Sequence, residues 1–148
     1  MRTSLGFAAV VLLSAASVLM AQQSGDGVMY WPKGVPPQGA SYKADFGNHI
    51  VSLSHRDANG KVEVHKTKTD VMVIQSGEAD LVTGGEAVGL VSTGPDEFLG
   101  TSIKGGTKRH ISAGDVIRVP AGTPHQFFLA PGTQITYSVV KVVTEPKH

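Results

Sequence analysis

The residues best suited to metal chemistry lie in a short segment that ends at His125. Pro120 ends one predicted strand and Gly122 allows a tight turn, so we expect the chain to double back here. Pro124 stiffens the backbone just before His125, which begins the next predicted strand. A rigid backbone aims the histidine side chain, as a metal ligand requires. Since the chain has no cysteine, any metal must bind to imidazole and carboxylate groups.

This segment resembles the second sequence motif of the cupin superfamily. That motif reads Gly, five residues, Pro-x-Gly, two residues, His, three residues, Asn. Gly114 provides the first glycine, and the proline, the second glycine and His125 follow at the expected spacing. Leu129 stands in the place of the asparagine, a position that is usually structural.

The first cupin motif is matched less completely. It reads Gly, five residues, His-x-His, three or four residues, Glu, six residues, Gly. Counting back from Gly77 places Asp70 at the glutamate position and His65 at the second histidine position. Glu63 then takes the place of the first histidine, and Asp57 that of the leading glycine.

The resemblance implies a metal site made of Glu63, His65, Asp70 and His125. Residues i and i+2 of a strand point to the same side, so Glu63 and His65 face the interior together. Two imidazoles and two carboxylates suit one divalent transition metal, Fe, Mn, Ni or Zn. We expect the carboxylate that is less committed to the metal, Glu63 or Asp70, to act as the catalytic base.

Several alternatives stay open at this point. Glu63 could be a solvated strand residue that pairs with Lys61 or Lys66, and Asp70 could cap a turn. A metal-free barrel with a polar pocket is also compatible with the degenerate first motif. His55 could enter the pocket from its strand. The residues that we expect to line or back the pocket are Met72, Gln75, Phe127, Phe128 and Tyr137.

The remainder of the chain predicts strands that would position this site. Short alternating or apolar runs separated by Gly-rich turns indicate an all-β sandwich or barrel. The Asn59-Gly60 pair predicts a tight hairpin turn, and residues 86–108 predict a long irregular insertion, for which a lid over the pocket is one hypothesis. The predicted strands cover residues 49–55, 62–65, 70–75, 79–83, 115–119, 125–129 and 134–143.

The resemblance implies a fold class that agrees with this pattern. We expect a small single-domain cupin β-barrel, a jelly roll or double-stranded β-helix, with an extended N-terminal arm. The arm is predicted at residues 22–45, where glycines and prolines surround a possible anchor, Trp31, and the barrel domain at residues 46–148.

Residues 1–21 have the character of a secretory signal peptide. Arg2 precedes an uncharged stretch with an apolar centre at Phe7–Leu13, and Ala21 provides a small residue before the predicted cleavage site. A membrane anchor is the alternative, but Leu5–Ala21 is shorter than the roughly 20 residues of a typical span. We therefore expect an exported protein, periplasmic or secreted, without a membrane segment after cleavage.

The charge balance restricts the class of partner. Without Arg2, the 13 basic residues of the chain become 12 and equal the 12 acidic ones. Nucleic acids and anionic membranes select basic surfaces, so neither is expected to be a partner. An exposed edge strand would need cover, which leads us to expect a homodimer.

The expected function is that of a metal-dependent enzyme acting on a small organic molecule. The resemblance to cupins implies dioxygenase, isomerase, decarboxylase or lyase chemistry. A non-catalytic cupin that binds or senses a small molecule in the cell envelope is the alternative. A metal that only stabilises a barrel without disulfides is a third possibility.

Overall fold

The computed structural model describes residues 27–36 and 42–144, and the regular secondary structure of this part of the chain is almost entirely β-strand. No helix among the described residues is long and apolar enough to cross a membrane. The predicted signal peptide lies outside the described residues. The elements are η1 (Pro32–Gly34), β1 (Lys43–Asp45), β2 (His49–Arg56), β3 (Val62–His65), β4 (Lys68–Thr83), β5 (Glu86–Val88), β6 (Val91–Gly94), β7 (Glu97–Gly100), β8 (Ser102–Lys104), β9 (Thr107–Ser112), β10 (Val116–Val119), β11 (His125–Phe128) and β12 (Ile135–Val143).

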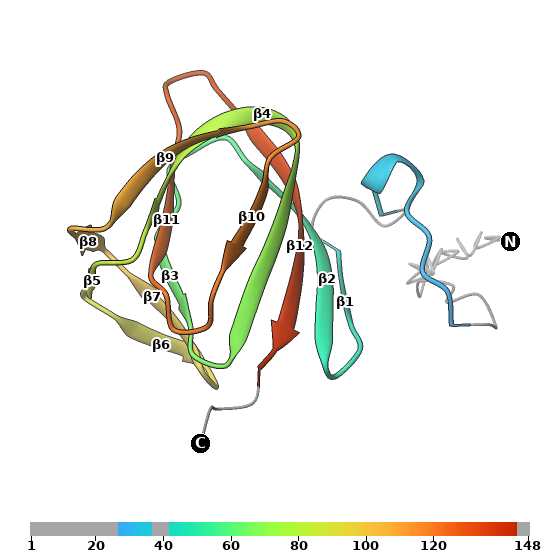
Figure 1. Cartoon of the computed structure of the whole chain (residues 1–148), viewed down its shortest axis with the longest axis horizontal. Helices are drawn as coiled ribbons and strands as arrows, with labels where there is room; N and C mark the ends of the chain where they lie inside the picture. Colours follow the sequence, from blue (N-terminus) through green and yellow to red (C-terminus); the bar gives the residue numbers. More distant parts are fainter. Residues whose placement is uncertain (1–26, 37–41, 145–148) are drawn as a thin grey trace, which may run out of the picture.

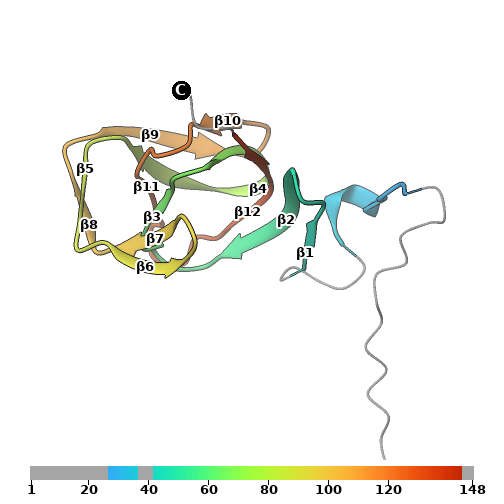
Figure 2. The same ribbon diagram turned by 90° about the horizontal axis from the view of Figure 1, so that it is seen from below.

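Ten of these strands form one strongly curled sheet around a common interior (Figure 1). Its main order is β1-β2-β12-β4-β11-β3-β7-β6, and β9 and β10 also pair with β4. A separate two-stranded sheet, β5 with β8, lies at the end of the barrel far from β1 (Figure 2). The expectation of an all-β barrel of the jelly-roll type is confirmed.

The long strand β4 belongs to both walls of the barrel and bends at Gly77. Before Gly77 it pairs with β10 and β12, and after it with β9 and β11. Gly77 has a φ of 77°, and a Cβ atom there would lie 1.9 Å from the carbonyl oxygen of Gln134. Only glycine fits this position. The prediction of two separate strands, 70–75 and 79–83, was wrong because the glycine bends the strand without ending it.

The connection between β2 and β3 is not a hairpin, because the two strands do not pair with each other. The connecting loop docks on β11 and the residue after it. The N–H of Gly60 donates to the carbonyl of Phe127 at 3.0 Å, and the N–H of Leu129 donates to the side chain of Asn59 at 2.8 Å. The prediction of a tight hairpin turn at Asn59-Gly60 was wrong, because β2 and β3 belong to different walls of the barrel and need a crossing loop.

The stretch 86–108 is regular, contrary to the prediction of an irregular insertion. It contains β5 to β8 and the start of β9. Strand β7 pairs with β3, and β6 pairs with β7, so this part of the stretch forms barrel wall. Strands of three or four residues between glycines are too short to produce a recognisable alternation.

The described part of the predicted arm lies against the β2 side of the barrel (Figure 1). Its last residues form β1, which pairs with β2. Upstream, Gln75 of β4 donates a hydrogen bond to the carbonyl of Gly34 at 3.3 Å. The half-buried Trp31 packs edge-on against Tyr42, with 6.2 Å between ring centroids.

The hydrophobic core occupies one half of the barrel interior. Each large apolar side chain that is fully buried contributes about 1.5–3 kcal/mol, so this cluster is the main source of stability in a chain without disulfides. The cluster consists of Met72, Ile74, Ala79, Leu81, Ile111, Val119, Phe127, Ile135, Tyr137 and Val139.

Candidate metal centre

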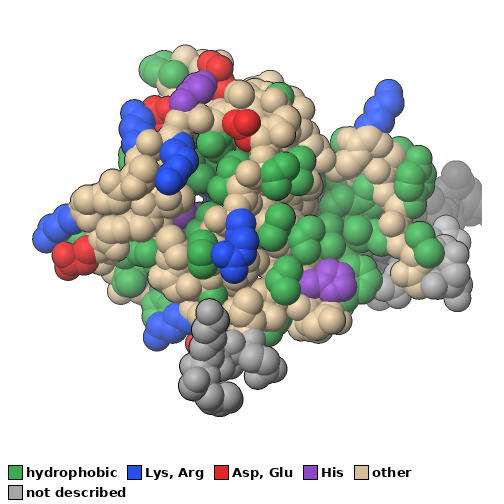
Figure 3. All heavy atoms as spheres, in the orientation of Figure 1, with side chains coloured by type: hydrophobic (Ala, Val, Ile, Leu, Met, Phe, Trp, Pro, Cys, Tyr) green, Lys and Arg blue, Asp and Glu red, His purple; other side chains and the backbone are tan. Residues whose placement is uncertain are grey.

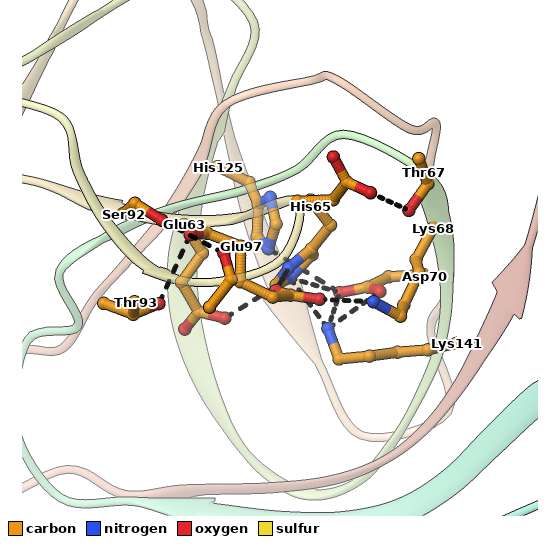
Figure 4. A network of polar contacts seen from close by, with 12 residues as sticks. Glu63, His65, Thr67, Lys68, Asp70, Ser92, Thr93, Glu97, His125 and Lys141 are labelled. Carbon is orange, nitrogen blue, oxygen red and sulfur yellow. Dashed lines mark hydrogen bonds and ion pairs between the residues drawn. The ribbon is translucent and has the colours of Figure 1, made fainter. Parts of the chain in front are cut away.

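The four predicted ligands meet inside the barrel (Figure 4). Glu63 and His65 project from β3, Asp70 from β4 and His125 from β11. Glu63 and His125 are direct cross-strand neighbours, and such neighbours on one face are about 5 Å apart at Cβ. The resemblance therefore identified side chains that the fold brings together. Their role as metal ligands stays a prediction.

The spacing of the donor atoms fits a divalent ion. His65 Nε2 lies 3.6 Å from Glu63 Oε2 and 3.4 Å from Asp70 Oδ2, and His125 Nε2 lies 3.7 Å from the same Asp70 oxygen. Metal–donor bonds of about 2.0–2.2 Å place neighbouring donors about 3–4 Å apart. One donor atom each of Glu63, His65 and His125 also lie within 4.8 Å of one another. These three residues could hold a metal ion, and Asp70 lies beside them.

Lys141 of β12 was not among the predicted site residues, yet it lies in the middle of the site (Figure 4). Its Nζ is 2.9 Å from both carboxylate oxygens of Asp70 and 2.7 Å from His65 Nε2. Lys141 and Asp70 are direct cross-strand neighbours in the pairing of β12 with β4. Only this register reveals the contact, because the two residues are far apart in the sequence.

Arg56 of β2 is a second cation that the sequence did not reveal as part of the site. It forms an ion pair with Glu63 and donates from Nε to the hydroxyl of Tyr137 at 2.7 Å. The Tyr137 ring stacks on Phe127 with 4.8 Å between centroids, and Arg56 lies over the Phe127 ring. Arg56 therefore links the carboxylate of Glu63 to the aromatic end of the hydrophobic core.

Glu97 of β7, in the stretch predicted to be irregular, completes the surroundings of His65. Its carboxylate contacts His65 Nδ1, and its other oxygen accepts a hydrogen bond from Lys68 at 2.7 Å. His65 and Glu97 are direct cross-strand neighbours. A carboxylate on the second nitrogen of a histidine fixes the orientation of the ring, as is common for metal-binding histidines.

Both predicted carboxylate ligands are stabilised in their ionised form. Burial by itself would raise the pKa of Glu63, but its hydrogen bond with His65 and nearby positive charges such as Arg56 lower it to about 2. Burial likewise acts to raise the pKa of Asp70, and the contacts with His65 and Lys141 lower it. At neutral pH both groups carry the negative charge that a metal ligand or a proton acceptor needs.

The two histidines differ in protonation. Burial lowers the pKa of His125, and its Nδ1 lies 3.1 Å from the carbonyl of Thr123. A neutral His125 that donates from Nδ1 leaves the lone pair of Nε2 directed at the site. For His65, burial acts to lower the pKa, but hydrogen bonds with Asp70 and Glu63 raise it to about 9.

Of the other side chains that we expected to line or back the pocket, some belong to the core and others lie away from the site. Met72, Phe127 and Tyr137 belong to the core, as the alternation of their strands implies. Gln75 contacts the arm through Gly34, and Phe128 is exposed, so the expectation that these two line the pocket was wrong.

Among the described residues, His55 and His110 lie outside the site. His55 is exposed and contacts the hydroxyl of Thr136 at 2.9 Å, so it does not enter the pocket. His110 is exposed on the surface.

Comparisons with known proteins support the fold and leave the reaction open. No protein-family model matches the sequence, and no significant match was found among curated proteins. Among solved structures, the Cnp3 cupin domain of Schizosaccharomyces pombe matches with a TM-score of 0.51 and 11% identity, over 70% of this chain and 59% of that one.

Two further matches have lower TM-scores. A cupin protein from Bacteroides fragilis matches with a TM-score of 0.47 and 20% identity, over 70% of this chain and 72% of that one. An oxalate oxidase in complex with glycolate matches with a TM-score of 0.47 and 16% identity, over 68% of this chain and 44% of that one.

Proposed function

The chain has the cupin fold, and from this premise we propose that it is a metal-dependent cupin enzyme acting on a small organic molecule. The observation that carries the proposal is the meeting of Glu63, His65 and His125, with Asp70 beside them, in the barrel interior. The donor set suits Fe, Mn, Ni or Zn. A bound ion would supply Lewis-acid or oxygen-activating chemistry, of the dioxygenase, isomerase, decarboxylase or lyase type.

The cations around the site favour an anionic substrate. Arg56, Lys68 and Lys141 have side chains that are 25%, 19% and 20% exposed, so each is partly accessible. Each of them is paired with a carboxylate, Glu63, Glu97 and Asp70 in that order, and their remaining N–H donors are available to a carboxylate or an enolate oxygen of a substrate. We infer a small organic acid or a molecule that becomes an enolate during the reaction.

The carboxylates have different parts in this proposal. The side chain of Glu63 is 24% exposed, whereas that of Asp70 is 2% exposed and held by Lys141. A substrate can therefore reach Glu63 more readily than Asp70, but the low pKa of Glu63, about 2, makes its carboxylate a weak base.

The test is the metal content of the mature protein, purified without chelators and measured by elemental mass spectrometry. We expect about one transition metal ion per chain, and its loss in a His65→Ala/His125→Ala variant. A Lys108→Met variant, altered in an outer ion pair with Asp80, is the control and should keep its metal. Absence of metal in the wild type after reconstitution with Fe(II), Mn(II), Ni(II) and Zn(II) would contradict the proposal.

Export to the periplasm or the medium is part of the proposal and rests on the signal-like residues 1–21. Expression of the full chain in a bacterial host, followed by N-terminal mass analysis of the exported fraction, tests it. A new N-terminus near residue 22 is expected, whereas an intact N-terminus in the cytoplasm would contradict export.

We also propose a homodimer. Hydrophobic side chains gather on the face of the molecule that carries β12 and β2 (Figure 3). Val73 and Val116 are cross-strand neighbours and both exposed, as is Val142 of β12. Light scattering should give twice the mass of the chain, and a Val116→Lys variant should be monomeric. A monomeric wild type would exclude the dimer.

A further inference from the structure

Lys141 holds the position that a metal charge would take beside Asp70. The Asp70 side chain is 2% exposed, and both of its oxygens accept hydrogen bonds from the Lys141 ammonium at 2.9 Å. A carboxylate buried to this degree needs a positive partner, because an unpaired charge in the interior is strongly unfavourable. In the metal-free barrel Lys141 is that partner.

The contact between Lys141 and His65 excludes a metal from the same nitrogen. Nζ and Nε2 are 2.7 Å apart, so one proton lies between them. If Lys141 carries it, the single lone pair of Nε2 accepts the hydrogen bond. If His65 carries it, Nε2 has no free lone pair. In either case Nε2 cannot bind a metal ion until Lys141 moves.

The charge of the site leads to the same conclusion. Glu63 is paired with Arg56, and Asp70 with Lys141, so both proposed carboxylate ligands already have a cationic partner. A divalent ion that entered beside both would add two charges to a site whose carboxylates are already neutralised. Removing one of the two cations restores the attraction for the metal.

Of the two cations, Lys141 is the one that can leave. Arg56 is fixed at two points, Glu63 and the Tyr137 hydroxyl, and its guanidinium also lies over the Phe127 ring. The Lys141 side chain is flexible, is 20% exposed, and begins near the end of β12, two residues before Val143.

We propose that Lys141 is an internal cation that substitutes for the metal charge in the metal-free site and must leave His65 and Asp70 before a divalent ion binds. This inference rests on the metal site of the proposed function. It makes Lys141 the residue that sets the metal affinity of the barrel.

The test compares metal binding in the wild type, Lys141→Met and Lys108→Met. Methionine retains the length of the side chain and removes its charge. Lys108 pairs with Asp80 on the outer surface, so it controls for the loss of one positive charge from the protein. Titration calorimetry with Zn²⁺ and with Mn²⁺, on protein stripped by a chelator, gives the affinities.

We expect Lys141→Met to bind the metal at least about tenfold more tightly than the wild type. The effect of Lys108→Met should stay below about threefold. Tight binding by Lys141→Met together with no measurable binding by the wild type supports the inference and contradicts the metal-dependent function of the natural chain. Equal or weaker binding by Lys141→Met overturns the inference and leaves the metal site intact. No binding by any of the three proteins overturns both.

A second measurement needs no variant and stays informative if Lys141→Met does not fold. Lysine acylation of the wild type by a succinimidyl ester, followed by peptide mass mapping, reports the accessibility of Lys141. Saturation with Zn²⁺ should increase its labelling rate several-fold relative to Lys108 on the outer surface. An unchanged rate on the metal-loaded protein means that Lys141 does not move, and the inference fails.

Discussion

The two halves of the barrel interior share the strands β4, β11 and β12, which present apolar residues to one half and ionisable residues to the other. Along β12 the inward side chains are Ile135, Tyr137 and Val139, and then Lys141. Along β4, followed from Ile74 towards its first residue, the inward side chains are Ile74 and Met72, and then Asp70. From Tyr137 to Lys141 and from Ile74 to Asp70 the alternation is unbroken, so along these two strands the change from core to site is a change of residue type.

This comparison shows how the fold separates stability from chemistry. The apolar half gains stability from burial, whereas every ionisable group in the charged half needs a partner across the interior. In the charged half, the effect of changing one ionisable group therefore depends on whether its partner is present. In the apolar half, a buried side chain contributes without a specific partner. Mutations should distinguish the two halves clearly.

The largest expected effect is on the apolar half. Leu81→Ala removes a side chain that is 1% exposed, and we expect a loss of about 3–5 kcal/mol in the free energy of unfolding. Denaturant unfolding measures it. The metal content of the folded fraction should be unchanged, and a loss of metal in that fraction would show that the two halves are not separable.

The next effect is on the charged half. In the metal-free protein, Lys141→Met leaves Asp70 buried without its cation, and we expect a loss of about 3 kcal/mol. An Asp70→Leu/Lys141→Met double variant removes both charges and should recover most of that loss. Denaturant unfolding of the wild type, the single variants Asp70→Leu and Lys141→Met, and the double variant tests this dependence, and simple additivity of the two single changes would contradict it.

Glu97→Ala should alter the site with little effect on the core. We expect a 10- to 100-fold loss of metal affinity, of the order seen when the carboxylate partner of a metal-binding histidine is removed. Glu97→Gln, which can still hydrogen-bond His65 Nδ1, should recover part of it. Calorimetric titration with Zn²⁺ gives both values, and an unchanged affinity in Glu97→Ala would show that His65 is oriented by other contacts.

The smallest effect is the acid sensitivity that Glu63 introduces. Its pKa is lowered from 4.5 to about 2 on folding, so its contribution to stability is complete above pH 4.5 and is lost as the pH falls towards 2. Because Glu63 is partly exposed, we expect about 1 kcal/mol. Between pH 4.5 and 2, the free energy of unfolding of the metal-free Glu63→Gln variant should fall by about 1 kcal/mol less than that of the wild type. An identical pH dependence in both proteins would remove Glu63 as a cause.

The strand pattern made much of the fold predictable. Strand β3 was predicted with the bounds that the structure shows, and β2, β10, β11 and β12 within a residue at either end. The failures have local causes. Gly77 reads as the end of a strand although it bends one, and the strands between Glu86 and Lys104 are too short for alternation to be visible.

The sequence by itself determined which groups could meet. The spacing of Glu63 and His65 on one strand, the turn that aims His125 and the position of Asp70 before Gly77 are all local features, and local features can be read along the chain. The tertiary structure alone decided which side chains of other strands contact these groups in the barrel interior. Lys141, Glu97 and Arg56 enter the site through cross-strand register and barrel closure. A one-residue change of register would turn each of them outward, and no pattern within a single strand records that register.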